Sequence, residues 1–126
     1  MRSANGQDVN VAKRLLIVDD DARFRGLARM VLEAEFDVVG EAPEGESAVA
    51  AVRELDPDVV LLDVNLPDTT GFELAPRLVS AAGRPEVVMT SSRDDASYEQ
   101  LAQDAGAAAF LSKHDLSPSS LSRALS

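Results

Sequence analysis

The sequence feature that most constrains the fold is a strict alternation, five times over, of a short apolar run and a segment with helical spacing. The apolar runs are the strand candidates, and they cover residues 15–18, 36–42, 58–64, 86–91 and 107–112. In the segments that follow them, apolar residues recur every three or four positions, which is the period of an amphipathic helix. Strands that alternate strictly with helices predict a parallel sheet covered by helices on both faces. We therefore expect an α/β fold with a doubly wound, five-stranded sheet.

Local signals support the helices. The residues that repeat at helical spacing in the first helix, and that predict its buried face, are Phe24, Leu27, Ala28, Val31 and Leu32. Gly106 stands where a helix C-cap is expected. Ser117 followed by Pro118 is typical of an N-cap and a first helical residue, and predicts a last helix that reaches Ser126. Pro76 interrupts the third helix pattern unless it falls in the first turn.

The composition narrows the function classes. A chain of 126 residues has room for one domain, and a hydrophobic share of 45% is ordinary for a folded protein. The absence of cysteine excludes disulfides, thiol catalysis and zinc sites built on thiolates. A formal net charge of −10 argues against nucleic-acid binding through this chain, because neutralising phosphates requires a basic patch. The polar start and the lack of a long apolar run predict a cytoplasmic protein without membrane contact.

Polar residues stand at the carboxyl ends of four predicted strands. They are Asp19, Asp20 and Asp21 after the first strand, Asp63 in the third, Ser91 in the fourth and Lys113 after the fifth. In an open parallel sheet the ligand site lies at this edge, beside the point where the strand order reverses. The sequence contains only two lysines, so the place of Lys113 at this edge is notable. We expect these side chains to form one cluster.

The residue types of this cluster favour phosphoryl transfer. Carboxylates that converge on one point raise one another's pKa unless a cation removes their repulsion. Mg²⁺, which prefers oxygen ligands, is the natural occupant of such a cluster. A lysine and a hydroxyl on the same edge can contact phosphoryl oxygens. One carboxylate then remains as a nucleophile that forms an acyl phosphate, whereas proton abstraction and glycoside hydrolysis fit this set less well.

Over residues 13–126 the chain resembles the receiver domain of bacterial two-component response regulators. The matching motifs are VDDD, LLDVNLPDTTG, VVMTSS and GAAAFLSK, each at the expected strand end. The resemblance implies the flavodoxin-like (βα)5 fold with strand order 2-1-3-4-5, and leaves residues 1–12 as a flexible N-terminal tail. It also implies that the chain is not an enzyme but a phosphoacceptor with self-catalysed phosphotransfer and autodephosphorylation. The phosphoryl donor is then a sensor histidine kinase.

The same resemblance assigns the acceptor and the metal ligands. Asp63 matches the phosphoacceptor of the family. The residues that would hold Mg²⁺ are Asp19, Asp20, Asp63 and, through its backbone carbonyl, Asn65. Pro67 and Gly71 follow Asp63 by four and eight positions, as the loop of the family requires.

Three further roles come from the resemblance. Ser91 lies fifteen residues before the glycine of the fifth-strand motif, which selects it over Thr90 and Ser92 as the hydroxyl that contacts phosphate. Lys113 matches the phosphate-contacting lysine, and Phe110 the aromatic residue that switches together with Ser91. The resemblance also implies that the chain can form a homodimer through its fourth helix, fifth strand and fifth helix. The chain departs from the family in having Phe instead of Tyr at the switch, and His instead of the frequent Pro after the lysine.

Two other functions stay open at this point. In a phosphatase of the haloacid dehalogenase type, Asp19 would be the nucleophile and Asp21 the acid, although Arg23 replaces the usual Thr or Val and the chain is short for that family. A degenerate receiver would act only as an interaction module. The residue that becomes phosphorylated distinguishes a receiver from this phosphatase. It is Asp63 in a receiver and Asp19 in the phosphatase. For Asp21 we expect an N-cap role instead of metal binding.

Overall fold

The computed structural model describes residues 11–126 and contains one sheet of five parallel strands. The strands are β1 (Arg14–Val18), β2 (Asp37–Ala42), β3 (Val59–Asp63), β4 (Glu86–Ser91) and β5 (Ala109–Ser112). They pair in the order β2-β1-β3-β4-β5, and each pairing is parallel. The predicted α/β class, doubly wound sheet and strand order are confirmed. Most of the tail predicted for residues 1–12 lies outside the described residues.

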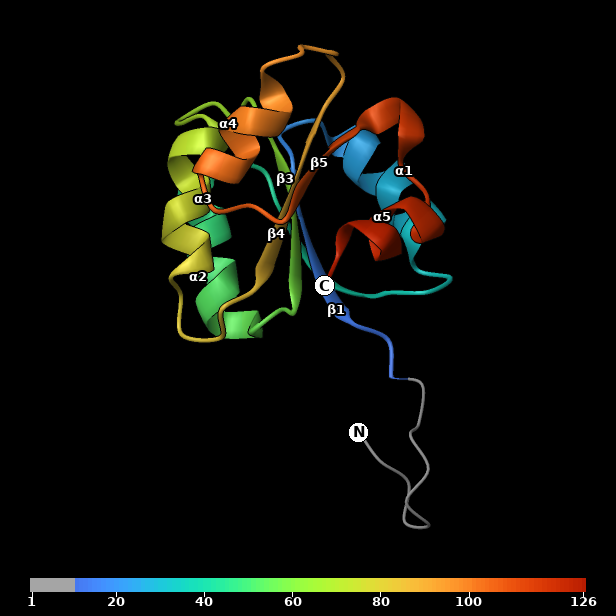
Figure 1. Ribbon diagram of the computed structural model, residues 1–126. Coiled ribbons are helices and arrows are strands. Elements are labelled where there is room, and N and C mark those ends of the chain that lie inside the picture. Colours follow the sequence, from blue (N-terminus) through green and yellow to red (C-terminus); the bar gives the residue numbers. More distant parts are fainter. Residues whose placement is uncertain (1–10) are drawn as a thin grey trace.

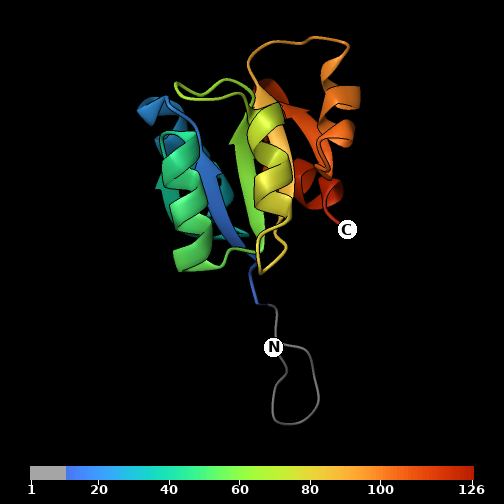
Figure 2. The same cartoon turned by 90° about the vertical axis from the view of Figure 1, so that its left-hand side faces the viewer.

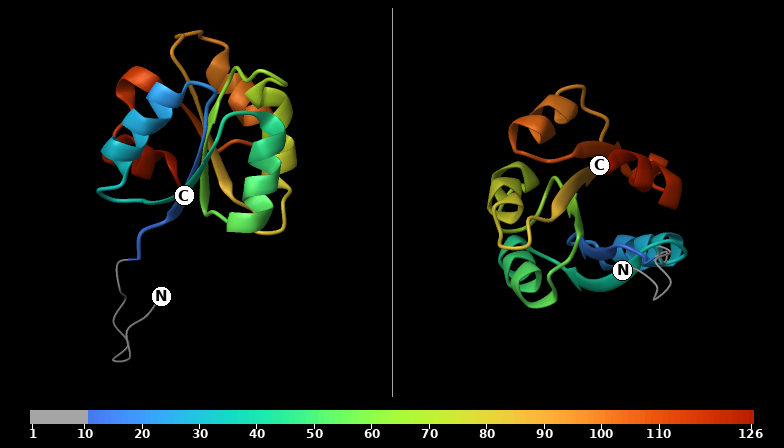
Figure 3. Two further views of the ribbon diagram at one scale, coloured as in Figure 1. Left: turned by 180° about the vertical axis from the view of Figure 1, so that it is seen from behind. Right: turned by 60° about the horizontal axis from the view of Figure 1, so that its bottom comes forward.

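Helices cover both faces of the sheet. Helices α1 (Ala22–Leu32) and α5 (Pro118–Ala124) lie on one face, and α2 (Gly45–Leu55), α3 (Gly71–Val79) and α4 (Tyr98–Asp104) lie on the other (Figure 1). Figure 2 looks onto the side of α2 and α3, and Figure 3 shows α1 and α5 from behind. Within residues 11–126, none of the helices combines the length and the apolar character needed to cross a membrane.

The central strand, β3, carries the acceptor candidate to the edge of the sheet. All five residues of β3 are buried. Val60 and Leu62 pack in the apolar cluster beneath α2, α3 and α4, whereas Val59 and Leu61 pack in the cluster beneath α1 and α5. A strand covered on both faces needs apolar side chains in both directions, which explains the continuous apolar run in the sequence. Asp63, the last residue of β3, then emerges at the carboxyl edge.

Side-chain caps begin three of the helices. Asp21 caps α1 by accepting hydrogen bonds from the N–H groups of Arg23 and Phe24. Thr70 caps α3 in the same way, and Ser117 caps α5. Such caps satisfy N–H groups that have no partner inside the helix. The predicted caps at Asp21 and Ser117 are confirmed.

Gly106 closes α4 as predicted, and its conformation moves the start of β5. Its φ of +87° lies in the left-handed region that favours glycine. The N–H of Gly106 donates to the carbonyl of Gln103, and the N–H of Ala107 donates to the carbonyl of Ala102, at 3.0 and 2.9 Å. These two bonds form a Schellman motif. Because Ala107 belongs to this cap, β5 begins at Ala109 and not at residue 107.

Other predicted boundaries are also wrong by one or two residues. β3 spans Val59–Asp63 and not residues 58–64. β2 begins after Phe36, because the N–H of Phe36 donates to the carbonyl of Leu32 at 2.9 Å and completes the turn after α1. α5 ends at Ala124 and does not reach Ser126. The N–H and hydroxyl of Ser126 donate to the Glu86 carboxylate at 3.0 and 2.9 Å, and these bonds draw the last residues out of the helix.

Two helix patterns also differ from the prediction. Ala28 and Leu32 of α1 are buried, but Leu27 is 61% and Val31 40% exposed. The fully buried side chains of α1 form one narrow stripe, and Leu27 and Val31 lie outside it. Pro76 is the sixth residue of α3, beyond the first turn, and the helix continues through it.

Candidate functional site

A cleft of about 300 Å³ lies at the carboxyl edge of the sheet, where the predicted site residues converge. It is lined by Asp19, Asp20, Asp21, Asp63, Asn65, Leu66, Pro67, Ser91, Ser92 and Lys113. The cleft therefore collects side chains from the ends of β3 and β4, and from the segments that follow β1, β3, β4 and β5. Each residue predicted to bind metal or to contact phosphate lines it, and Phe110 does not.

Three carboxylates form the acidic part of the cleft. Asp19, Asp20 and Asp63 each present an oxygen within 4.8 Å of the others. Asp19 is only 1% exposed and Asp63 7%, whereas Asp20 faces solvent. The Oδ2 atom of Asp19 is buried, and its close partner is the ammonium of Lys113 at 2.6 Å. A cluster of carboxylate oxygens of this kind fits a hard divalent cation.

The environment of Asp63 changes its acidity. Burial, together with the negative charge of Asp19, raises the pKa of Asp63 to about 6. Lys113 and the backbone N–H of Asn65 act in the opposite direction but do not cancel this effect. The carboxylate is thus more basic than an ordinary aspartate, and it is still mostly ionised at neutral pH.

Lys113 places a positive charge between two of these carboxylates. Its Nζ lies 2.6 Å from Oδ2 of Asp19 and 3.7 Å from Oδ1 of Asp63. The side chain is 16% exposed, so the ammonium is largely removed from water. It also lies over the ring of Phe24, 4.2 Å from the ring centroid. His114 and the next residue continue from Lys113 as a short 3₁₀ turn, Lys113–Asp115.

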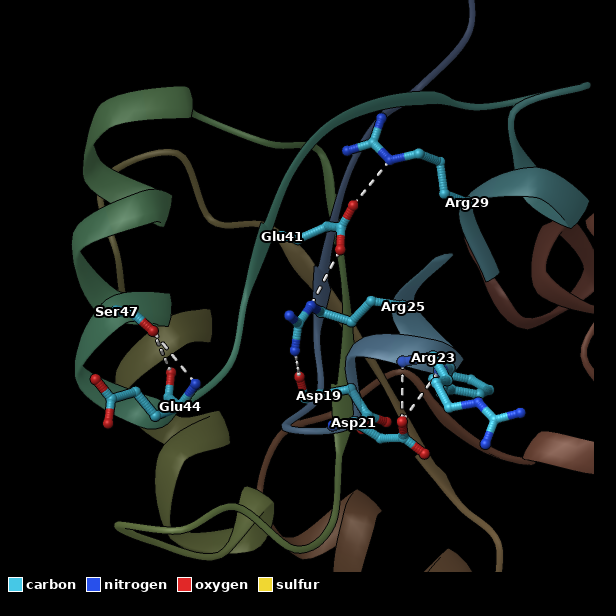
Figure 4. Close-up of polar contacts among 9 residues, drawn as sticks. Asp19, Asp21, Arg23, Arg25, Arg29, Glu41, Glu44 and Ser47 are labelled. Atoms are coloured by element: carbon cyan, nitrogen blue, oxygen red, sulfur yellow. Dashed lines mark hydrogen bonds and ion pairs between the residues drawn. The ribbon is translucent and has the colours of Figure 1, made fainter. Parts of the chain in front are cut away.

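The loop after β1 fixes Asp19 and turns Asp21 toward α1. The backbone N–H of Asp21 donates to Oδ1 of Asp19 at 2.9 Å. The carboxylate of Asp21 accepts from the N–H of Arg23 at 2.9 Å, as Figure 4 shows. Asp21 thus lines the cleft but uses its side chain as a cap, while Asp19 and Asp20 remain with Asp63.

Two arginines of α1 secure this loop from the side of β2. Nη1 of Arg25 donates to the backbone carbonyl of Asp19 at 2.6 Å, and its Nε donates to Glu41 at 3.0 Å (Figure 4). Nε of Arg29 donates to the other oxygen of Glu41 at 2.9 Å. Although partial burial opposes it, hydrogen bonds from Arg29 and Arg25 lower the pKa of Glu41. This network connects the backbone of a candidate metal ligand to β2.

The loop after β3 is also fixed, by close packing at Gly71 and by hydrogen bonds at Asp68. Gly71 begins α3 directly against Asp63, and a Cβ atom at Gly71 would clash with the Asp63 carbonyl oxygen. Asp68 accepts hydrogen bonds from the N–H groups of Gly45 and Glu46 at 2.8 and 3.1 Å, which ties the loop to the first turn of α2. The bond from Gly45 lowers the pKa of Asp68. Asn65 therefore lines the cleft from a loop that is anchored at both ends.

The predicted switch residues lie on adjacent strands. Ser91 is 2% exposed, and its Oγ accepts a hydrogen bond from the N–H of Arg93 at 3.0 Å. Phe110 on β5 is partly buried and contacts the ring of Tyr98 on α4, with centroids 5.5 Å apart. Tyr98 in turn contacts Phe72 on α3 at 5.4 Å. These three rings form an aromatic chain that connects α3, α4 and β5.

Sequence reasoning missed four residues that hold the site together. The helical spacing predicts Phe24 only as part of an apolar helix face, and it predicts no role for Arg25 and Arg29. Arginines four residues apart share a helix face, which is the signal that could have identified a common acidic partner such as Glu41. Asp68 gives no comparable signal, because its partners are more than twenty residues away in the sequence.

Comparisons with known proteins agree with this geometry. Residues 15–125 match a family model described as the response regulator receiver domain. The transcriptional regulatory protein DegU of Brevibacillus brevis is 36% identical over 85% of this chain and 47% of its own length. The chemotaxis protein CheY of Halobacterium salinarum is 33% identical over 86% of this chain and 91% of its own. The solved signal receiver domain of the response regulator NarL from Mycobacterium tuberculosis has a TM-score of 0.79 at 30% identity, covering 90% of this chain and 96% of that one.

The extent of these matches differs between relatives. The chain spans about half the length of DegU and nearly all of CheY. The match to the family model covers residues 15–125, which include all five strands except Arg14 and every residue that lines the cleft. The haloacid dehalogenase alternative finds no support in these matches.

Proposed function

Because this chain belongs to the family of response regulator receiver domains, we propose that it accepts a phosphoryl group from a sensor histidine kinase on Asp63. The observation that carries the proposal is the convergence of a buried carboxylate at the end of the central strand with two further carboxylates and a lysine. The family places the chain in two-component signal transduction. The acceptor, the metal ligands and the phosphate contacts are part of our proposal, and the convergence of these residues in one cleft supports them.

Asp63 is the nucleophile in this proposal. One oxygen of its carboxylate forms a bond to phosphorus while the bond from phosphorus to the histidine nitrogen of the kinase breaks, and the product is an aspartyl phosphate. The pKa of about 6 leaves the carboxylate ionised at neutral pH and more basic than usual. Water attack on the acyl phosphate later returns the free carboxylate, which is the autodephosphorylation expected of a receiver.

The other residues of the cleft act on the phosphoryl oxygens. Lys113, whose ammonium lies 3.7 Å from Asp63, supplies a fixed positive charge. Ser91 supplies a hydroxyl donor from the end of β4. The oxygens of Asp19, Asp20 and Asp63, with the backbone carbonyl of Asn65, would hold Mg²⁺. The ion would supply charge neutralisation for the phosphoryl group.

The test of the acceptor is to map the phosphorylated residue. Because the cleft contains the required groups, acetyl phosphate with Mg²⁺ should replace the kinase as donor. Reduction of the product with borohydride, followed by peptide mass spectrometry, should then locate the modification at Asp63. A modification at Asp19 would instead support the phosphatase, and the absence of any modification would support the interaction module.

Replacing Asp20 with alanine should weaken Mg²⁺ binding by about tenfold or more while the fold is retained, since it removes one charged ligand of three. Asp20 faces solvent, so its loss creates no cavity. Without metal the variant should be at least as stable as the wild type, because one repulsive charge is gone. Isothermal titration calorimetry measures the affinity, and thermal unfolding in EDTA measures the stability.

Asp21→Ser is the matched control for this measurement. It removes the neighbouring carboxylate of the same run, and serine can still cap α1. Its Mg²⁺ affinity should stay close to that of the wild type. If Asp20→Ala bound Mg²⁺ as tightly as Asp21→Ser, the metal would lie elsewhere.

The proposed output is a change of the surface formed by α4, β5 and α5. A phosphoryl group on Asp63 would draw the Ser91 hydroxyl into a charge-assisted hydrogen bond, and Phe110 would turn toward the space that this vacates. About 5.5 kcal/mol is enough to move an equilibrium from 1:99 to 99:1. This surface is also the proposed contact of a homodimer or of an output domain.

Ser91→Ala should therefore still accept phosphate on Asp63 but lose most of the change at this surface. The measurement is the amide chemical-shift change around Phe110 and α4 when beryllofluoride, a phosphoryl mimic, is added. Ser92→Ala, one residue further along and exposed, is the control and should respond like the wild type. Wild-type shifts in Ser91→Ala would show that this hydroxyl does not connect the cleft to the surface.

A further inference from the structure

We propose that Phe24 is a positioning residue for Lys113, and that the face of its ring holds the lysine ammonium between Asp19 and Asp63. This proposal rests on the proposed function, in which Lys113 contacts the phosphoryl group. It rests on the place of Nζ, which lies 4.2 Å from the centroid of the Phe24 ring. At that distance the negative face of an aromatic ring attracts a cation.

Lys113 has a further contact besides its two ion pairs. A lysine side chain has a flexible four-carbon stem, and water can hydrate its compact ammonium in many different positions. Here the ammonium is 2.6 Å from Asp19 and 3.7 Å from Asp63, with the ring of Phe24 as a further contact. The 16% exposure of the side chain means that water competes little, which strengthens a cation–π contact.

Phe24 is itself held in place by the first turn of α1. Its backbone N–H donates to Asp21 at 3.4 Å, and its side chain packs against the apolar cluster beneath α1 and α5. The next residue, Arg25, is bonded to the backbone carbonyl of Asp19 at 2.6 Å. The ring is therefore fixed relative to the same loop that carries the acidic cluster.

An uncharged ring suits this task better than a third carboxylate would. The ring attracts the ammonium without adding negative charge to the cleft, where phosphoryl oxygens must enter. The ring also offers no oxygen that would compete with those of Asp19 and Asp63 for a bound cation. Lys113 can thus keep one contact when either carboxylate changes its own partners.

The experiment compares Phe24→Leu with Phe24→Tyr. Leucine keeps the apolar packing but has no ring, whereas tyrosine keeps the ring. Initial rates of Asp63 labelling by acetyl phosphate at saturating Mg²⁺ should fall about 3- to 10-fold in Phe24→Leu and stay within about twofold of the wild type in Phe24→Tyr. Phe36→Leu is the matched control, because Phe36 belongs to the same apolar cluster but lies at the opposite edge of the sheet. It should be less stable yet label at the wild-type rate.

A double-mutant cycle tests whether Phe24 acts through Lys113. Phe24→Leu in a Lys113→Met background should label as fast as Lys113→Met alone, because the ring then has no cation to hold. An equal loss in both backgrounds, a wild-type rate in Phe24→Leu, or an equal loss in Phe24→Tyr would each overturn the proposal.

A readout independent of phosphate chemistry separates this proposal from the proposed function. In the unphosphorylated protein the ε-methylene protons of Lys113 should be shifted upfield by the ring current of Phe24, and Phe24→Leu should remove that shift. An unshifted Lys113 signal in the wild type would overturn the contact itself. A shifted signal in a protein that takes no label on Asp63 would instead overturn the assignment of Asp63 and leave the contact established.

Discussion

Replacing Asp63 with asparagine is expected to abolish labelling by acetyl phosphate in the presence of Mg²⁺. Asparagine has the same shape, but its amide is not a nucleophile toward phosphorus, so no acyl phosphate can form. The loss should be complete and not partial, because the chemistry needs this atom and because Asp63 alone lies at the end of the central strand within reach of Lys113. The measurement is incorporation of radioactive phosphate, or a mass increase in the intact protein.

The control for this variant is Asp21→Asn. It changes another acid that lines the same cleft, and asparagine is as good an N-cap as aspartate. Asp21→Asn should be labelled at close to the wild-type rate. Labelling that persists in Asp63→Asn would contradict the receiver function, and labelling that moves to Asp19 would revive the phosphatase.

Asp63→Asn should also make the metal-free protein more stable at neutral pH, by up to about 3 kcal/mol. Burial and the charge of Asp19 raise the pKa of Asp63 from 3.8 to about 6 in the folded state. The folded protein then binds this proton more tightly than the unfolded chain, so stability falls as the pH rises. The stability is fully present below about pH 4 and is lost as the pH passes through about 6.

The measurement is the difference in free energy of unfolding between Asp63→Asn and wild type, from urea titrations in EDTA. This difference should be small at pH 4 and should grow until about pH 7. Asp94→Asn, which removes an exposed carboxylate outside the acidic cluster, should show no comparable growth. A difference that did not depend on pH would show that burial of the Asp63 charge is not costly. Adding Mg²⁺ should reduce the difference, because a ligand that binds only the folded wild type stabilises it.

The part of the site that could be predicted from the sequence is the part set by strand ends. A parallel sheet brings the carboxyl ends of its strands to one edge, so Asp19, Asp63, Ser91 and Lys113 could be placed together from the alternation of strands and helices. The caps at Asp21 and Ser117 could be predicted for a similar reason, because their partners lie two or three residues away.

The supporting contacts could not be predicted, because they depend on how the helices pack. The helical period places Phe24, Leu27 and Val31 on one side of α1, but it does not say how wide a stripe the sheet will cover. The result is that Leu27 faces solvent, whereas Phe24 lies beside Lys113. The contact of Asp68 with α2 joins residues 23 positions apart and follows from the path of a loop. Patterns in the sequence carry no information on such a path.

The aromatic chain from Phe72 through Tyr98 to Phe110 has a spectroscopic consequence. The sequence contains one tyrosine and no tryptophan, so all emission of this protein apart from the weak emission of phenylalanine comes from Tyr98. Tyr98 contacts the ring of Phe110, the residue proposed to turn on phosphorylation. Its fluorescence intensity and anisotropy therefore report on that surface directly. The native chain carries its own optical probe, and no label has to be introduced where it would disturb the surface under study.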